Sequence, residues 1–375
     1  MFVSDREVGG VIVAPVLVPS CVIEEQLFVL PFRNMLPSRS ILLPFRNILR
    51  ADLPHTGIGA LALAAVLCAQ LAAPAVADEI RWGAVGHDDK PNLGPGYSYN
   101  RQSLDRQMQL LTAAGLHWYR TGCVDKGCAD LLAAAQKAGV SILRGIALWP
   151  DGHTDESGNY KRAYKYGSDL AREYPQFQYF EASNEVDNWV GMKGDGSSRS
   201  QYNQDRYPQA RGLIKGLIDG VHAGNPSAKV LVDDAGYCHY GFLKALWEDG
   251  IRWDITAFHW YADQGNIEKA RCNAANVAAI HASFGPPVWI TEFNSNIAAR
   301  DNDDTEAQQW LSEFVAQMFG VARKYKIEGV FVYELLDEPN LPGEQGHYGI
   351  ADGNGNPKKP HKAISDSLAS RGAKQ

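Results

Sequence analysis

The chain has 375 residues, of which 45% are hydrophobic and 21% are charged, and its formal net charge is −7. This is the composition of an ordinary globular protein, and the negative charge argues against a basic surface for nucleic acid. The sequence contains neither a Cys-x-x-Cys pair nor a glycine-rich phosphate loop followed by lysine. The length allows one large domain or two.

A short apolar run of small residues at positions 57–71 stands out near the start of the chain. Arg46 and Arg50 precede this run, and Ala75-Val76-Ala77 follows it, which is the pattern of a signal peptide cleaved after Ala77. The alternative is a membrane anchor, but the run is short for a span of about 20 residues. We therefore predict that residues 1–77 are removed and that no stable membrane insertion remains.

The mature protein is then residues 78–375, and it is expected to be secreted or periplasmic. The export signal begins far from the first residue, and residues 1–50 show no sustained helix or strand period. We hypothesise that translation begins at Met35. A mature amino terminus upstream of Asp78 would contradict this interpretation.

Four cysteines remain after residue 77, which fits an exported protein with disulfides: Cys123, Cys128, Cys238 and Cys272. Four cysteines allow three pairings, and four free thiols are the alternative. We favour Cys123–Cys128 with Cys238–Cys272, because the first pair closes one short loop.

From residue 78 onward, strand-like and helix-like segments alternate along the chain. The predicted strands cover residues 80–84, 117–121, 140–148, 177–182, 228–233, 254–260, 288–292 and 329–333. The predicted helices cover residues 104–114, 129–138, 160–174, 200–223, 242–248, 267–284, 305–325 and 361–370. Short apolar strands that alternate with helices predict a parallel sheet closed into a single-domain (β/α)8 TIM barrel.

Two glutamates occupy equivalent positions at the ends of strands: Glu185 follows the fourth strand, and Glu292 ends the seventh. Glycoside hydrolysis needs two carboxyl groups, one to protonate the leaving oxygen and one at the anomeric carbon. We predict that Glu185 is the acid/base, with a raised pKa, and that Glu292 is the nucleophile. Because the two strands face each other across the barrel, we expect a separation of about 5 Å, which is typical of retaining enzymes.

This arrangement resembles a clan A glycoside hydrolase over residues 78–375. In that clan the acid/base belongs to an Asn-Glu pair after the fourth strand, here Asn184-Glu185, and the nucleophile ends the seventh, here Glu292. The segment from Tyr333 to Pro360 is similar to family 39 and its bacterial endo-acting relatives, with family 5 a near competitor. The resemblance implies a polysaccharide substrate.

The resemblance also implies roles for residues around the two glutamates. Arg120 would keep the nucleophile ionised, Asn184 would hold the sugar 2-hydroxyl, and Tyr261 of a His-x-Tyr motif that begins at His259 would hydrogen-bond the nucleophile. Many clan members carry tryptophan at the end of the eighth strand, where this chain has Tyr333-Glu334. This departure weakens any inference about the sugar bound nearest the glutamates.

Further polar and aromatic residues that follow strands are candidates for sugar binding: His87, Trp149, Trp189 and Tyr333. Aromatic rings near a carbohydrate cleft often stack on sugar faces, although each of these side chains has a structural alternative as a packed core or rim residue. Asp233, Asp234 and Glu181 are expected to be structural and to hold arginine or lysine partners.

The sequence therefore predicts a retaining, endo-acting glycosidase that cleaves a β-linked glycan or exopolysaccharide as a monomer. No cofactor is expected, because protons and carboxylates perform this chemistry. A metal site at His87, Asp88 and Asp89 is the rival chemistry, but neither a His-x-His after the first strand nor a His-Glu-x-x-His is present. A catalytically silent carbohydrate-binding barrel is the alternative of a different class.

Overall fold

The computed structural model describes residues 80–372 apart from 91–93 and 95. The predicted leader, the cleavage site after Ala77 and Met35 lie outside the described residues. The described residues belong to one compact unit.

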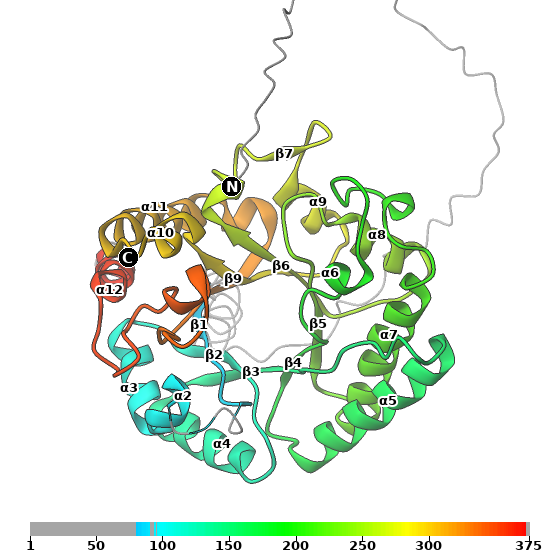
Figure 1. Ribbon diagram of the computed structural model, residues 1–375, viewed down its shortest axis with the longest axis horizontal. Coiled ribbons are helices and arrows are strands. Elements are labelled where there is room, and N and C mark those ends of the chain that lie inside the picture. Colours follow the sequence, from blue (N-terminus) through cyan, green and yellow to red (C-terminus); the bar gives the residue numbers. More distant parts are fainter. Residues whose placement is uncertain (1–79, 91–93, 95, 373–375) are drawn as a thin grey trace, which may run out of the picture. The chain divides into compact units, whose positions relative to one another are not determined.

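Eight parallel strands form a closed barrel in which each strand pairs with its neighbours in chain order (Figure 1). The barrel strands are β1 (Arg81–Val85), β2 (Trp118–Thr121), β3 (Ser141–Gly145), β4 (Tyr179–Glu181), β5 (Lys229–Val232), β6 (Ile255–Tyr261), β9 (Val288–Asn294) and β10 (Ile327–Val332). The last strand closes the ring on the first, with Arg81 opposite Gly329. The predicted (β/α)8 TIM barrel is confirmed.

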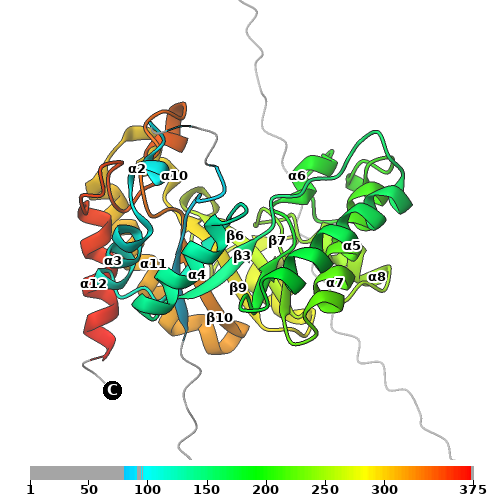
Figure 2. The same ribbon diagram turned by 90° about the horizontal axis from the view of Figure 1, so that it is seen from below.

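Helices surround the ring and cover the outer face of the strands (Figure 1). The larger helices are α3 (Leu104–Ala113), α4 (Gly127–Ala138), α5 (Glu156–Glu173), α7 (Tyr207–Gly224), α8 (Gly241–Glu248), α9 (Val277–Ser283), α11 (Asp304–Tyr325) and α12 (Lys359–Gly372). Three short helices, α2 (Ser98–Arg101), α6 (Val186–Val190) and α10 (Asn296–Asp301), lie at one end of the barrel (Figure 2). Two of them, α6 and α10, directly follow barrel strands β4 and β9.

Local signals in the sequence set several helix ends. The Ser103 hydroxyl accepts a hydrogen bond from the Arg106 backbone amide and caps α3. Gly139 ends α4 with φ 68°, a left-handed conformation that favours glycine. The Asp303 carboxylate accepts hydrogen bonds from two amides at the start of α11.

Two hydrophobic layers hold the barrel together. The inner cluster of buried side chains fills the ring and comprises Val85, Leu143, Leu231, Ile255, Ala257, Trp289 and Phe331. The much larger outer cluster joins the strands to the surrounding helices. The inside of the ring is therefore filled by the side chains of the inner cluster, and a site must lie at the ends of the strands.

Two predicted helices differ from the structure. Helix α7 begins at Tyr207 rather than near residue 200, because Pro208 favours a first-turn position, and a separate 3-10 turn covers Arg199–Gln201. The predicted helix over 267–284 is a short hairpin, β7 (Arg271–Cys272) and β8 (Ala275–Asn276), followed by α9. Its turn residues have positive φ, which ends any helix there.

The structure contains the disulfide pairing favoured from the sequence, Cys123–Cys128 and Cys238–Cys272. The second bridge ties the hairpin of β7 and β8 to the segment between β5 and α8. Among the described residues, none of the helices has the length and apolar character that crossing a membrane requires.

Candidate active site

A cavity of about 550 Å³ lies at the carboxyl ends of the barrel strands. Most of the side chains predicted from the sequence line it: His87, Arg120, Trp149, Asn184, Glu185, Tyr261, Glu292 and Tyr333. His259 is fully buried and reaches the cavity through contacts with both glutamates. The alternation of strand and helix thus brings together residues that lie far apart in the chain.

Glu292 lies near the end of β9 and is only 6% exposed. Arg120 Nη1 donates a 2.7 Å hydrogen bond to its Oε1 atom, and the Tyr261 hydroxyl donates a 2.6 Å hydrogen bond to Oε2. Burial alone would lower the pKa of Arg120, but the charges of Glu181 and Glu292 raise it above its usual value. These two hydrogen bonds hold the carboxylate in one orientation and place a positive charge beside it, as a nucleophile requires.

Glu185 has the left-handed backbone conformation, with φ 45° and ψ 47°, where the chain leaves β4 and enters α6. This conformation costs roughly 1–2 kcal/mol for a residue other than glycine. Asp233, which follows β5, offsets the cost because its carboxylate accepts the Glu185 amide at 3.2 Å. The neighbouring strand thus fixes the direction in which Glu185 enters the cavity.

The Glu185 side chain accepts hydrogen bonds from two neighbours. His259 Nδ1 lies 2.7 Å from Oε1, and the side-chain amide of Asn188 donates through Nδ2 to Oε2 at 2.9 Å. Burial alone would raise the pKa of Glu185, but the hydrogen bond and charge of His259 lower it below its usual value. The raised pKa expected from the sequence is therefore wrong for the unliganded site, because the sequence did not show that His259 contacts Glu185.

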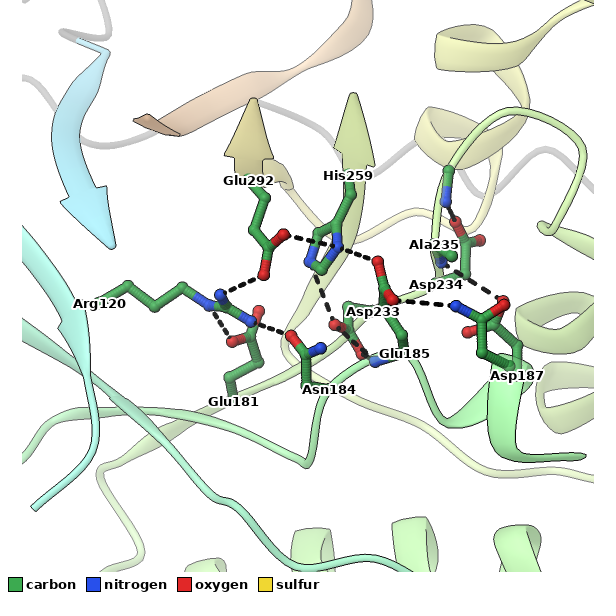
Figure 3. Close-up of polar contacts among 12 residues, drawn as sticks. Arg120, Glu181, Asn184, Glu185, Asp187, Asp233, Asp234, Ala235, His259 and Glu292 are labelled. Atoms are coloured by element: carbon green, nitrogen blue, oxygen red, sulfur yellow. Dashed lines mark hydrogen bonds and ion pairs between the residues drawn. The ribbon is translucent and has the colours of Figure 1, made fainter. Parts of the chain in front are cut away.

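His259 on β6 lies between three carboxylates. Its Nδ1 atom is 3.4 Å from Glu292 Oε2, and its Nε2 atom is 3.3 Å from Asp233 Oδ2 (Figure 3). Burial alone would lower the pKa of His259, but the charge of Glu292 and the contacts with Asp233 and Glu185 raise it well above its usual value. The site therefore holds a buried imidazolium next to both glutamates.

The two glutamates are close enough for a retaining mechanism. A carboxylate oxygen of Glu185, a carboxylate oxygen of Glu292 and a ring nitrogen of His259 all lie within 4.8 Å of one another. Retaining glycosidases separate their two carboxyl groups by about 5–5.5 Å and inverting ones by about 6.5–9.5 Å. The same three side chains could converge on a metal ion, but Arg120 and the His259 imidazolium already supply positive charge there.

Arg120 connects the nucleophile position to two residues of the Asn-Glu segment. Its Nη2 atom donates to Asn184 Oδ1 at 2.5 Å, and its Nε atom donates to Glu181, which is fully buried (Figure 3). Burial raises the pKa of Glu181, and the charge of Arg120 opposes that rise. Glu181 therefore holds an arginine partner, and the guanidinium fork fixes Asn184 relative to Glu292.

The remaining predicted sugar-binding residues fall in different places. Trp149 is 43% exposed and lines the cavity, and Tyr333 lines it next to His87, with a ring-centroid separation of 5.8 Å. Trp189 is not among the lining residues. It packs partly buried against the outer core, 5.5 Å from the Arg206 guanidinium, so its placement is that of a packed aromatic residue.

Several residues that line the cavity were not singled out as site residues from the sequence. They lie in loops and short helical turns after the strands, and they include Lys90, Ser183, Asp263, Gln264, Asn296, Glu344, Gln345 and Tyr348. The Tyr348 ring lies 5.8 Å from Tyr261 and 5.3 Å from Tyr333, so it completes an aromatic wall. Loop conformation places these side chains, and no periodic signal in the sequence encodes it.

The closed barrel and the pair of glutamates at its strand ends are typical of enzymes that cleave carbohydrates. A comparison of the sequence with protein families points to the same class. Residues 217–346 match the family model described as "Glycosyl hydrolase catalytic core". This match supports a glycosidase, although it covers the second half of the barrel only. None of the curated proteins matches the sequence.

Solved structures share the fold at low sequence identity. The GH53 catalytic domain of Ignisphaera aggregans has 15% identity and a TM-score of 0.57, covering 79% of this chain and 98% of that one. GH5_18 of Streptomyces cattleya, in complex with GlcNAc, has 15% identity and a TM-score of 0.55, with 79% and 81% covered. Xylanase 10B of Thermotoga petrophila, in complex with xylobiose, has 13% identity and a TM-score of 0.56, with 78% and 95% covered. These are clan A barrels, and at such identities the likeness establishes the fold.

Proposed function

We propose that the chain is a secreted or periplasmic retaining glycoside hydrolase that cleaves β-linked polysaccharide internally. Within clan A, we propose a family 39 type, with family 5 as the competitor. The observation that carries the proposal is the approach of Glu185 and Glu292 within 4.8 Å in one cavity at the carboxyl ends of the strands. The two disulfides are consistent with export.

The first step forms a bond between the Glu292 carboxylate and the anomeric carbon while the glycosidic bond breaks. The leaving oxygen takes a proton from Glu185. In the second step Glu185 removes a proton from water, the water oxygen bonds to the anomeric carbon, and the ester to Glu292 breaks. Arg120 and Tyr261 stabilise the Glu292 carboxylate before attack and after release.

The proton for the leaving oxygen is held in the resting site by the Glu185–His259 pair. The lowered pKa of Glu185 and the raised pKa of His259 place this proton on His259, 2.7 Å from Glu185. As the bond from Glu292 to the anomeric carbon forms, Glu292 loses the charge that raises the pKa of His259. In the same step the proton passes from His259 Nδ1 through Glu185 to the leaving oxygen, so nucleophile attack and proton delivery are linked.

Trp149 and the aromatic wall of Tyr261, Tyr333 and Tyr348 supply flat apolar surfaces for sugar rings. Sugar faces bind such surfaces while their hydroxyls meet polar groups at the edges, including Asn184. An exposed tryptophan at the cavity rim suits a substrate that extends beyond the cleaved bond. This favours a polymer over a small glycoside.

The test is oligosaccharide release from a panel of β-glucans, mannans, xylans and exopolysaccharides by wild type and by Glu292→Gln. We expect release by wild type only, and the product sizes distinguish internal from terminal cleavage. Glu328→Gln, which changes a partly exposed glutamate paired with Arg81, is the matched control and should behave as wild type. If wild type binds one glycan and releases nothing, the catalytically silent binding barrel replaces this proposal.

A further inference from the structure

A second group of ionisable side chains lies at one wall of the cavity, where the last strand meets the first. His87 follows β1, and Glu334 and Glu338 follow β10. A ring nitrogen of His87 and one carboxylate oxygen from each glutamate lie within 4.8 Å of one another. We call these three residues the seam cluster. The catalytic steps described above use none of them.

The seam cluster contains buried acceptors without partners among the described residues. Glu338 is 1% exposed, and neither of its carboxylate oxygens has a hydrogen-bond partner. Glu334 is fully buried, and its Oε1 atom has none either. A buried carboxylate oxygen without a partner is costly, and a bound cation would satisfy these three free oxygens together.

The neighbouring charges do not supply enough compensation. Lys90 influences both glutamates through its charge, but its Nζ atom lies over the Tyr97 ring, 5.9 Å from the centroid. Asp89 acts on Glu338, and Asp337 and Glu292 act on Glu334, and all three add negative charge. One lysine therefore faces an excess of carboxylates.

His87 adds a nitrogen atom to these carboxylate oxygens. Its Nε2 atom has no hydrogen-bond partner among the described residues and lies 3.4 Å from Glu334 Oε2. A free imidazole nitrogen that faces two buried carboxylates makes a mixed nitrogen and oxygen ligand set of the kind that metal ions bind.

We propose that the seam cluster binds one divalent cation of the zinc class, with His87, Glu334 and Glu338 as its protein ligands. Two carboxylates balance a charge of +2, and the imidazole adds a nitrogen ligand. Zinc accepts mixed nitrogen and oxygen ligands, whereas Ca²⁺ and Mg²⁺ prefer oxygen alone. The Tyr99 hydroxyl donates to Glu334 Oε2 at 2.9 Å and orients that ligand, as outer hydrogen bonds do at metal sites.

The position of this cation gives it a structural role. It joins the segment after β1 to the segment after β10, and these two strands close the barrel. His87 and Tyr333, which immediately precedes Glu334, also line the catalytic cavity. The cation thus stabilises the barrel closure and holds one wall of the cavity, without taking part in bond cleavage.

The test uses the full, tag-free chain stripped with a chelator and titrated with Zn²⁺, with bound metal and Tm as readouts. We expect one Zn²⁺ per chain and an increase in Tm of about 5 °C at saturation. Glu338→Gln should bind Zn²⁺ at least about a hundredfold more weakly and lose this increase. Its metal-free Tm should equal or exceed that of metal-free wild type, because a neutral amide costs less to bury, and a folding defect would lower it instead.

Two controls locate the ion. Glu292→Gln removes a carboxylate from another set of converging ligands at the cavity, Glu185, His259 and Glu292, and Glu328→Gln changes a glutamate outside all such sets among the described residues. Both variants should bind Zn²⁺ as wild type does. Retained binding in Glu338→Gln, lost binding in Glu292→Gln, no binding by wild type, or a Tm increase with Ca²⁺ but not Zn²⁺ would each overturn the proposal.

Discussion

The Nδ1 atom of His259 lies 2.7 Å from Oε1 of Glu185, and this contact reverses the protonation expected of the two side chains. Glu185 has a lowered pKa and His259 a raised one. In the proposed mechanism, the histidine rather than the acid therefore holds the proton for the leaving oxygen. Glu292 is the largest source of the rise in the His259 pKa, so the position of this proton depends on the nucleophile.

The first prediction concerns the titration of His259. In wild type the ring should titrate well above the usual range of a histidine, and Glu292→Gln should decrease its pKa because the carboxylate charge is lost. Ring-nitrogen NMR shifts measure both values, with Glu328→Gln as control. Because folding raises this pKa, the histidine contributes stability that is complete below about pH 6.5 and is lost as the pH rises through the folded-state value. A neutral ring at pH 7 in wild type would contradict the proton-storage mechanism.

Glu185→Gln tests the acid/base role. Turnover of a natural glycan should fall by about 10²–10⁴-fold, because general acid catalysis is lost. An aryl glycoside with a good leaving group should lose less in its first step, since it needs no proton, and azide should partly restore turnover by replacing the activated water. Steady-state rates with both substrate types check this. Turnover of the natural glycan at the wild-type rate would show that another group supplies the proton.

Arg120→Lys tests the three-way contact of the guanidinium. A lysine keeps the charge but cannot bond Glu181, Asn184 and Glu292 together, since its ammonium is a single point of charge. We expect kcat to fall by about 10- to 100-fold, which corresponds to the loss of one or two charged hydrogen bonds. Arg81→Lys, at the start of β1, is the matched control and should leave kcat unchanged. Equal kcat values for the two variants would assign Arg120 a charge-only role.

Trp149 tests sugar stacking, and Trp189, which does not line the cavity, is the matched control. Trp149→Ala should raise KM for a polymer by about 2- to 12-fold with little change in kcat, because one aromatic stacking surface is lost. Trp149→Phe should restore most of the affinity. Trp189→Ala should lower Tm through lost packing but leave KM unchanged, because Trp189 does not line the cavity. A rise in KM for Trp189→Ala alone would reverse this assignment.

The barrel was predictable because alternating short apolar strands and capped helices leave few other architectures. The sequence placed Glu185 and Glu292 at strand ends, and the strand order of a closed barrel then brings them together. It predicted an arginine or lysine partner for Glu181 but did not identify Arg120, and it did not show that His259 would lie against Glu185. Such contacts depend on the direction of side chains at the strand ends. The hydrophobic periodicity and the secondary-structure propensities of the sequence do not specify that direction.

Errors in the predicted elements have local causes. The region 267–284 has enough apolar and alanine residues to indicate a helix, but Asn273 and Ala274 adopt positive φ and Cys272 is bonded to Cys238. A disulfide between distant positions overrides helix propensity here. The seam cluster was equally hidden, since Glu334 and Glu338 meet His87 only through barrel closure.

The stereochemistry of cleavage tests the central claim most directly. On the best glycan of the panel, ¹H NMR can record the anomer at the new reducing end before mutarotation. Because the carboxylate oxygens of Glu185 and Glu292 lie within 4.8 Å, we predict a product with the configuration of the bond that was cleaved. A product of inverted configuration would contradict the double displacement and the assignment of Glu292 as nucleophile.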